Sequence, residues 1–521
     1  MEKQNFNRIR VPHKAGRFQS ELPVHRFERS PSRKLLKEDS SLRRLWVALA
    51  TITAVVFFIR HPISWLRTDI SQVQRPGNPC DTRQHGYQCR PEISHYWGQY
   101  SPYFSVPSEI NNTVPDTCKI TFVQILSRHG ARDPTAYKTI YYRNLVKKIK
   151  SDVEVFDGKY AFLKDYEYTL GEDQLSKFGE QELYDSGIKY YERYRDLAVD
   201  YMPFVRASGQ DRVVMSAQYW IEGFHQAKMS DLMNKDSIKD GRHYDFVVIS
   251  EAPGSNNTLN HGLCKNFESD TGHNGHLAAI AQDKYAKEAF PVIQERLERE
   301  LPGLKVSSEE ASYLMDLCAF ETVHSPTGEI SPFCDLFNED EWRIYDWYQT
   351  LGKWYGFSHG NPLGPTQGVG FANELIARLT GKPLQDHTST NHTLDDHPET
   401  FPLGKGHVLF ADFSHDNDMT DIFSALEMFH NVPQLSNTTR MSIEETHGYS
   451  AARTVPFAAR AYFEKMKCDG IDDELVRVVL NDRVLPLETC EGDSLGRCTL
   501  DNFVESLSFA RHGGKWDECF D

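Results

Sequence analysis

Ile120-Thr-Phe-Val-Gln-Ile-Leu126 is an apolar run that leads, after Ser127, into Arg128-His129-Gly130-Ala131-Arg132-Asp133-Pro134. Its β-branched and aromatic side chains predict a buried strand. The glycine and proline that follow predict a turn at the end of that strand. An imidazole between two guanidinium groups, in a turn that leaves a strand, can hold a phosphate group and attack it.

The composition bounds the classes of partner. The chain has 521 residues, of which 39% are hydrophobic and 25% charged, so most of it should form a globular core. The net charge is −16, but residues 1–44 hold 12 Lys or Arg against 5 Asp or Glu, so the rest carries −23. This acidity argues against nucleic acid as a partner. An anionic substrate would therefore need a local basic pocket on this acidic protein. No sequence feature indicates an oligomeric state.

The N-terminal part is typical of a targeting segment rather than a folded domain. Residues 1–44 are basic and polar, which is typical of a disordered tail. The mostly apolar run 45–59 and its continuation to 66 predict a signal anchor, with the basic tail cytoplasmic and the body luminal or extracellular. The protein would then be a single-pass type II membrane protein of the secretory pathway. The alternative is a cleaved signal and a secreted protein. Residues 67–79 read as a linker.

Ten cysteines and four glycosylation sequons support an oxidising compartment. All cysteines follow residue 79, and their even number without a C-x-x-C motif favours disulfides over a metal site. The N-x-S/T sequons, on the same side of the chain, begin at Asn111, Asn256, Asn391 and Asn437. No zinc-type spacing is present, so the sequence predicts neither a metal nor a cofactor.

The remaining pattern alternates strands with helices. Further strands are expected at 244–250, 407–413 and 476–480, and helices at 179–195, 283–300 and 372–379. We therefore expect an α/β fold with a mixed, mostly parallel central sheet flanked by helices. Residues 80–254 and 400–521 would form this catalytic domain. The helix-rich interval 255–399 would form a smaller inserted all-α domain.

Two more segments place polar residues at strand ends. The strand 407–413 is followed by Ser414-His415-Asp416-Asn417, and Arg206 lies in Phe204-Val-Arg-Ala-Ser-Gly-Gln-Asp-Arg-Val213, a strand-to-turn context. Ligands in open α/β sheets bind beyond the carboxyl ends of strands. These residues are therefore candidates for the same site as His129.

At this point the sequence resembles a known family. R-H-G-x-R-x-P with a later H-D is the signature of the histidine acid phosphatases, and FVRASG…DRV, GKYAFLK, NELIARLT and GNPLGPTQGVG are similar to fungal phytases. The resemblance runs from about Cys80 to Cys519. It implies a phosphomonoesterase, most closely a 3-phytase acting on phytate at acidic pH.

The resemblance also implies roles for the site residues. His129 would be the nucleophile that forms a phosphohistidine, and Asp416 would protonate the leaving alcohol. Phosphate would be bound by Arg128, Arg132, Arg206 and His415. Neighbouring arginines should lower the pKa of His129, and a bound phosphate should raise that of Asp416, so both shifts favour an acidic working range.

The family pattern implies a disulfide pairing that spacing alone leaves open. The implied pairs are Cys80–Cys89, Cys118–Cys468, Cys264–Cys519, Cys318–Cys334 and Cys490–Cys498. For substrate choice, Lys159, Lys164 and Lys353 match positions expected near the pocket of a phytase. The pair Gly352-Lys353 stands where these phytases have two lysines, which leaves room for a broad-specificity acid phosphatase.

Two other functions compete with phosphoester hydrolysis. A phosphoglycerate-mutase-like phosphotransfer enzyme shares R-H-G, but the x-R-x-P extension, the H-D motif and the cysteines argue against it. A non-catalytic, membrane-tethered relative should have lost His129 or Asp416, and both are present.

Overall fold

The computed structural model describes residues 86–88, 90–231, 244–269, 275–325, 329–404 and 406–520. The predicted tail, anchor and linker over 1–79 lie outside these ranges, as do Cys80 and Cys89. Within them, no helix combines the length and the apolar character that a membrane span requires.

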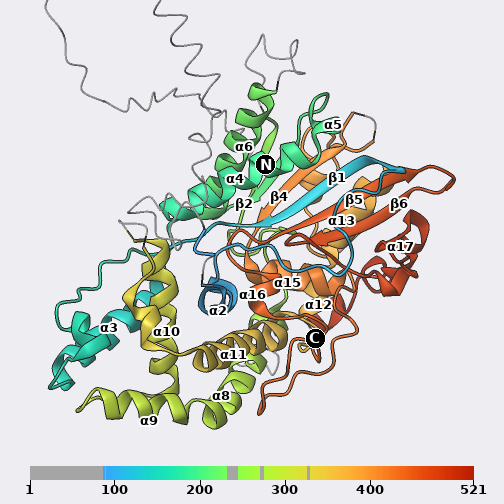
Figure 1. The fold of residues 1–521 in the computed structure, drawn as a ribbon. Coiled ribbons are helices and arrows are strands. Elements are labelled where there is room, and N and C mark those ends of the chain that lie inside the picture. Colours follow the sequence, from blue (N-terminus) through green and yellow to red (C-terminus); the bar gives the residue numbers. More distant parts are fainter. Residues whose placement is uncertain are drawn as a thin grey trace, which may run out of the picture. The chain divides into compact units, whose positions relative to one another are not determined.

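A central sheet organises the fold (Figure 1). Its strands are β1 Cys118–Arg128, β2 Phe204–Ser208, β3 Phe246–Ile249, β4 Leu409–Ser414, β5 Arg460–Cys468, β6 Leu475–Leu480, β7 Arg483–Val484 and β8 Arg497–Thr499. The order is β3-β2-β4-β1-β5-β6-β7, and β8 pairs with β6. The expected mixed sheet flanked by helices is confirmed, but it is not mostly parallel, because antiparallel pairs outnumber parallel ones. Parallel pairing is confined to the half from β3 to β1, and every pair from β1 to β8 on the other half is antiparallel.

The strands predicted from apolar runs correspond to β1, β3, β4 and β6. β5 was not predicted, because charged residues interrupt its apolar pattern. One of these charges is compensated inside the protein: Glu464 of β5 is completely buried and receives hydrogen bonds from Arg477 and Arg193 at 2.8 and 2.9 Å. A strand that buries an ion pair does not show the alternation on which strand prediction relies.

Helices cover both faces of the sheet (Figure 1). One face packs against α4 Lys177–Arg193 and α6 Asp211–Ser230 through Val123, Val205, Leu183 and Trp220. The other packs against α13 Val369–Thr380, α15 Asp416–Ala425 and α17 Leu500–Ser506. The predicted helices 179–195 and 372–379 correspond to α4 and α13.

A second, purely helical core lies beside the sheet (Figure 1). It is built from α3 Ala136–Asp152, α8 Leu277–Ala289, α9 Pro291–Glu300, α10 Ser308–Val323 and α11 Glu339–Phe357. The predicted helix 283–300 is two helices, because Pro291 lacks the N–H that would continue the first one. α3 joins this core from the first part of the chain. The division at 255–399 into an inserted domain stays a prediction.

Four of the five implied disulfides are present: Cys118–Cys468, Cys264–Cys519, Cys318–Cys334 and Cys490–Cys498. Cys118–Cys468 joins paired residues at the ends of β1 and β5, which ties the first strand of the sheet to a partner 350 residues later.

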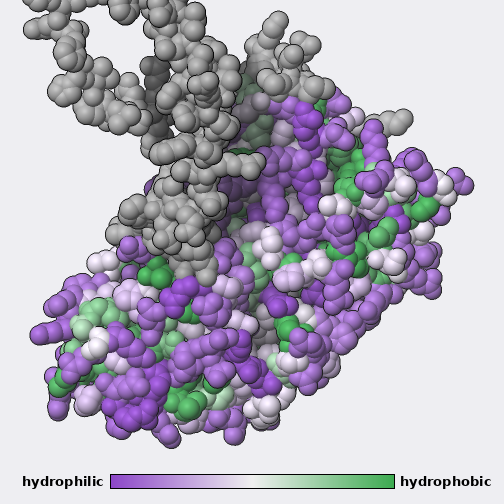
Figure 2. Space-filling view, in the orientation of Figure 1, coloured by the Kyte–Doolittle hydropathy of each residue, from purple (hydrophilic) through white to green (hydrophobic). Residues whose placement is uncertain are grey.

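Figure 2 shows a largely hydrophilic face with apolar residues in scattered patches. Of the four sequon asparagines, Asn111 is exposed and the others are half-buried.

Candidate active site

The candidate site forms where the four parallel strands end. β1 and β4 pair in a register that sets Arg128 beside Ser414, so His129 and His415 leave the sheet next to each other. Their rings lie 5.6 Å apart. β2 and β3 end at the same edge and are followed by Arg212 and Glu251. Segments that are far apart in sequence therefore meet at one point, as expected for an open α/β sheet.

The ring of His129 is held with one nitrogen free of hydrogen bonds among the described residues. It is fully buried, and its Nδ1 donates a hydrogen bond to the carbonyl of Gly130 at 2.8 Å. Because a carbonyl can only accept, Nδ1 carries the proton and Nε2 keeps its lone pair. Nε2 has no hydrogen-bond partner among the described residues. Burial and the charges of Arg212, Arg128 and Arg132 lower the pKa of His129 well below 6.5.

Three guanidinium groups around His129 have free N–H groups within the described part of the chain. The Nε atoms of Arg128, Arg132 and Arg212 are buried without a hydrogen-bond partner, and Nη2 of Arg128 makes only an ion pair with Asp416 at 3.2 Å. Burial and the charge of Arg132 lower the pKa of Arg212 to about 9. Buried donors normally find partners. The three Nε–H groups are therefore suited to an anion bound over the imidazole.

The prediction that Arg206 binds phosphate is wrong. Every nitrogen of its guanidinium donates a hydrogen bond of 2.5–3.2 Å to Glu374 or Asp412, so none is left for a phosphate. Arg206 lies inside β2, in register with Asp412 of β4, so its side chain points toward α13 and not beyond the strand end. Arg212 of the same motif reaches the site instead. Gly209 marked the end of the strand, and Arg212, the second residue of α6, lies beyond it.

His415 is oriented by a carboxylate that the sequence prediction missed. His415 Nε2 lies 2.9 Å from Glu251 Oε1, and the same oxygen accepts a hydrogen bond from Ser208 Oγ at 2.6 Å. The hydrogen bond and charge of His415 outweigh burial and lower the pKa of Glu251 to about 2. Glu251 follows β3 at the same sheet edge. Its position directly after a predicted strand could have marked it as a candidate site residue.

Asp416 begins α15 and sits between two cations. Its Oδ1 lies 3.2 Å from Arg128 Nη2, and its Oδ2 lies 2.5 Å from Lys353 Nζ. Burial raises the pKa of Asp416, but the charges of Arg128 and Lys353 outweigh it and hold the pKa well below 3.8. Lys353 also donates to Asn417 Oδ1 at 2.5 Å, so this lysine from α11 reaches the site.

The two other lysines predicted near the pocket have different surroundings. Lys159 Nζ donates to the carbonyl of Leu336 at 3.0 Å and lies 3.7 Å from Glu300. Lys164 is exposed at the end of the same 3₁₀ segment, Gly158–Lys164. Neither lysine contacts the residues around His129, so their role in substrate binding stays a prediction.

Backbone packing fixes the turn that carries His129. A Cβ on Gly130 would lie 2.4 Å from the carbonyl oxygen of Gly179, and a Cβ on Gly179 would lie 2.1 Å from that of Ala131. The turn therefore rests directly on the first turn of α4. Gly130 N–H donates to Ser216 Oγ at 3.1 Å, and Ala131 N–H donates to Glu182 Oε2 at 2.8 Å. These contacts pre-organise the imidazole.

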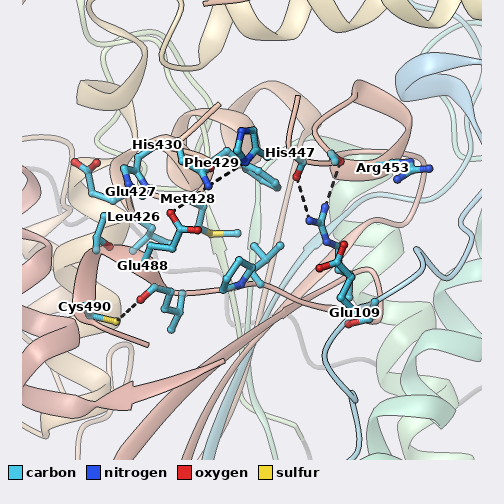
Figure 3. A pocket seen from close by; sticks show the side chains of 18 of the residues that line it. Glu109, Leu426, Glu427, Met428, Phe429, His430, His447, Arg453, Glu488 and Cys490 are labelled. Carbon is cyan, nitrogen blue, oxygen red and sulfur yellow. Dashed lines mark hydrogen bonds between the residues drawn. The ribbon is translucent and has the colours of Figure 1, made fainter. Parts of the chain in front are cut away.

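A separate hollow opens elsewhere on the protein (Figure 3). This cavity of about 530 Å³ is lined by Glu109, Met428, His447, Arg483 and Glu488 among others. None of the residues described around His129 lines it. The hollow is therefore distinct from the candidate site.

We expect Arg206→Ala to lower the free energy of unfolding by about 3–5 kcal/mol, because it leaves Glu374 and Asp412 buried without their cation. Chemical denaturation at neutral pH measures the change. Arg299→Ala, which removes a largely exposed arginine, is the control and should change stability by less than about 0.5 kcal/mol. Equal effects of the two substitutions would contradict a structural role for Arg206.

Comparisons with known proteins agree with this architecture. The chain is 52% identical over 445 residues to Phytase A of Aspergillus oryzae, covering 85% of this chain and 94% of the relative. It is 50% identical over 445 residues to Phytase A of Aspergillus fumigatus, with the same shares covered. The crystal structure of the phytase from D. castellii superposes with a TM-score of 0.64 at 24% identity, covering 82% of this chain and 87% of that one.

The fold is also shared with a more distant structure. The multiple inositol polyphosphate phosphatase of Bifidobacterium longum, in complex with phosphate, has a TM-score of 0.56 at 15% identity and covers 81% of this chain and 99% of its own. The pattern of the histidine phosphatase superfamily, branch 2, matches residues 119–481, which include the strand ends described above. The chain belongs to the histidine phosphatase superfamily, branch 2.

Proposed function

We propose that this protein hydrolyses phosphomonoesters at acidic pH through a phosphohistidine, with phytate as its substrate. The observation that carries the proposal is the free Nε2 of His129 surrounded by the unpaired N–H groups of Arg128, Arg132 and Arg212. A phosphoryl group there would meet a lone pair on one side and cations around its oxygens. About 50% identity to fungal Phytase A over most of the chain supports the choice of substrate.

The reaction has two steps. His129 Nε2 attacks phosphorus while the bond to the leaving oxygen breaks, and the three arginines and His415 stabilise the charge on the remaining oxygens. Water then attacks the phosphohistidine, releasing inorganic phosphate and restoring neutral His129. Guanidinium groups supply the positive charge that this chemistry requires.

Asp416 is proposed to protonate the leaving alcohol. Without substrate its charge is balanced by Arg128 and Lys353. An incoming phosphate competes for Arg128 and adds negative charge nearby, and both effects raise the pKa of Asp416. The carboxyl can then bind a proton and deliver it to the leaving oxygen. Lys353 is a positioning residue that holds Asp416 against Asn417.

The finer assignments are also proposals. A 3-phytase would release the phosphate at position 3 of the inositol ring first, and product analysis after one turnover tests this. A broad-specificity acid phosphatase is the alternative, for which the single lysine at Gly352-Lys353 is the supporting observation. Four disulfides support a location in the secretory pathway. Anchoring through 45–66 stays a prediction.

The proposed substrate is tested by comparing kcat/KM for phytate and for p-nitrophenyl phosphate at acidic pH. We expect phytate to be the better substrate. The His129→Ala variant should lose activity on both, because it removes the nucleophile. Similar efficiencies on the two substrates would favour the broad acid phosphatase, and activity retained by His129→Ala would overturn the mechanism.

Arg212→Gln should lower kcat/KM by about 10²–10³, because one donor to the phosphoryl oxygens is lost. Its melting temperature should change little, since the guanidinium has few partners in the described structure. Steady-state kinetics and a thermal melt measure both. Arg206→Ala is the comparison, because it should lower the melting temperature more than Arg212→Gln does. An unchanged kcat/KM in Arg212→Gln would show that Arg212 does not bind the phosphoryl group.

Asp416→Asn should lower the rate on phytate by about 10²–10⁴, because its alkoxide leaving group requires a proton. The rate on p-nitrophenyl phosphate should fall much less, since nitrophenolate leaves without protonation. The ratio of the two losses is the readout. Equal losses on both substrates would assign Asp416 to phosphate binding or folding and not to proton donation.

The pH dependence follows from the lowered pKa of His129. A free imidazole is protonated below 6.5, but His129 stays neutral and nucleophilic as the pH falls below that value. We therefore expect that kcat/KM for p-nitrophenyl phosphate does not fall when the pH is lowered through 6.5. Because Arg212 contributes to the shift, Arg212→Gln should move the acidic limb toward higher pH. A wild-type limb near 6.5 would contradict the electrostatic account.

A further inference from the structure

A second cluster of chemically capable side chains lies one turn beyond Asp416 on α15. Asp418 and Asp421 point inward from this helix and are 4% and 1% exposed. His261 faces them from the segment before α7 Lys265–Glu268. One ligand atom from each of these three residues lies within 4.8 Å of the others. The cluster lies outside the proposed phosphate chemistry.

Asp421 is the observation that points to a ligand. Both of its carboxylate oxygens are buried, and neither has a hydrogen-bond partner among the described residues. A carboxylate without partners is costly to bury, so a buried one pairs with a charge, coordinates a metal or takes up a proton. The carboxylate of Asp421 lies beside an imidazole and a second carboxylate, which favours a shared occupant.

The neighbouring contacts arrange the cluster as a metal site would require. His261 Nδ1 lies 2.5 Å from Glu268 Oε1, which leaves Nε2 as the ring nitrogen for a ligand. A carboxylate behind a histidine is the usual support of a metal-binding imidazole. Asp418 Oδ1 accepts the backbone N–H of His261 at 2.5 Å, so the carboxylate and the imidazole are fixed relative to each other.

The local charge also favours a cation. Asp418, Asp421 and Glu268 are acidic. Lys353, whose charge acts on Asp421, has its ammonium bound by Asp416 and Asn417. His261, which lies 2.5 Å from Glu268, can offset only one of these charges, so three carboxylates share one imidazole.

We propose that His261, Asp418 and Asp421 bind one divalent transition-metal cation of the zinc class. An imidazole nitrogen with two carboxylates suits Zn²⁺, Co²⁺ or Mn²⁺, whereas Ca²⁺ and Mg²⁺ prefer oxygen ligands alone. The cation would be structural, because it would tie α15 to the segment around His261. The proposal is independent of the phosphatase mechanism.

The test uses the full chain without a polyhistidine tag, stripped with chelator and titrated with Zn²⁺ alone in phosphate-free buffer at neutral pH. Calorimetry should show one Zn²⁺ per chain, and Ca²⁺ should give no comparable binding. Asp421→Asn should weaken the binding at least about tenfold. Asp472→Asn removes one negative charge from an exposed position and should leave it unchanged.

A spectroscopic arm keeps the test decisive if Asp421→Asn fails to fold. Co²⁺ bound by the wild-type protein at a low-coordinate nitrogen–oxygen site should give visible absorption that Zn²⁺ abolishes. Absence of both the absorption and stoichiometric Zn²⁺ binding would overturn the proposal and assign a proton to Asp421. Equal Zn²⁺ affinity in folded Asp421→Asn and wild type would overturn it as well.

Discussion

The parallel pairing of β1 with β4 is the constraint on which the candidate site depends. Its register sets Arg128 beside Ser414, so the residues that follow, His129 and His415, emerge together at one edge of the sheet. β2 and β3 continue the parallel half and bring Arg212 and Glu251 to the same edge. A shift by one residue would turn these side chains to the other face.

The site concentrates positive charge inside a chain that is strongly acidic overall. Burial first, and then repulsion from neighbouring arginines, lowers the pKa values of Arg128, Arg212 and His129. Asp416 and Glu251 offset part of this charge and leave the Nε–H groups of the three arginines without a partner among the described residues. The arrangement leaves an excess of cations that an incoming anion can neutralise.

The sequence predicted the elements with clear periodicity and the site residues within a recognisable motif, His129, Arg128 and Arg132 among them. It assigned the wrong arginine of a strand-to-turn segment, because the exact end of β2 decides between Arg206 and Arg212. It also missed β5 and the cluster around Asp421. The buried charge of β5 is paired with arginines from other elements, and Asp421 lies beside a histidine distant in sequence. A local sequence pattern cannot reveal contacts between residues that are far apart along the chain.

The contact between Gly130 and Gly179 has a consequence for how this chain can be diversified. Two backbone segments touch where each lacks a side chain, so a Cβ at either position would meet the backbone of the other segment and each glycine is restricted by itself. A library that randomises Gly130 or Gly179 will lose most of its members to this clash, whatever the sequence of the other segment. Substitutions meant to reshape substrate preference are better made on α11 around Lys353, where a side chain reaches the site from a separate helix.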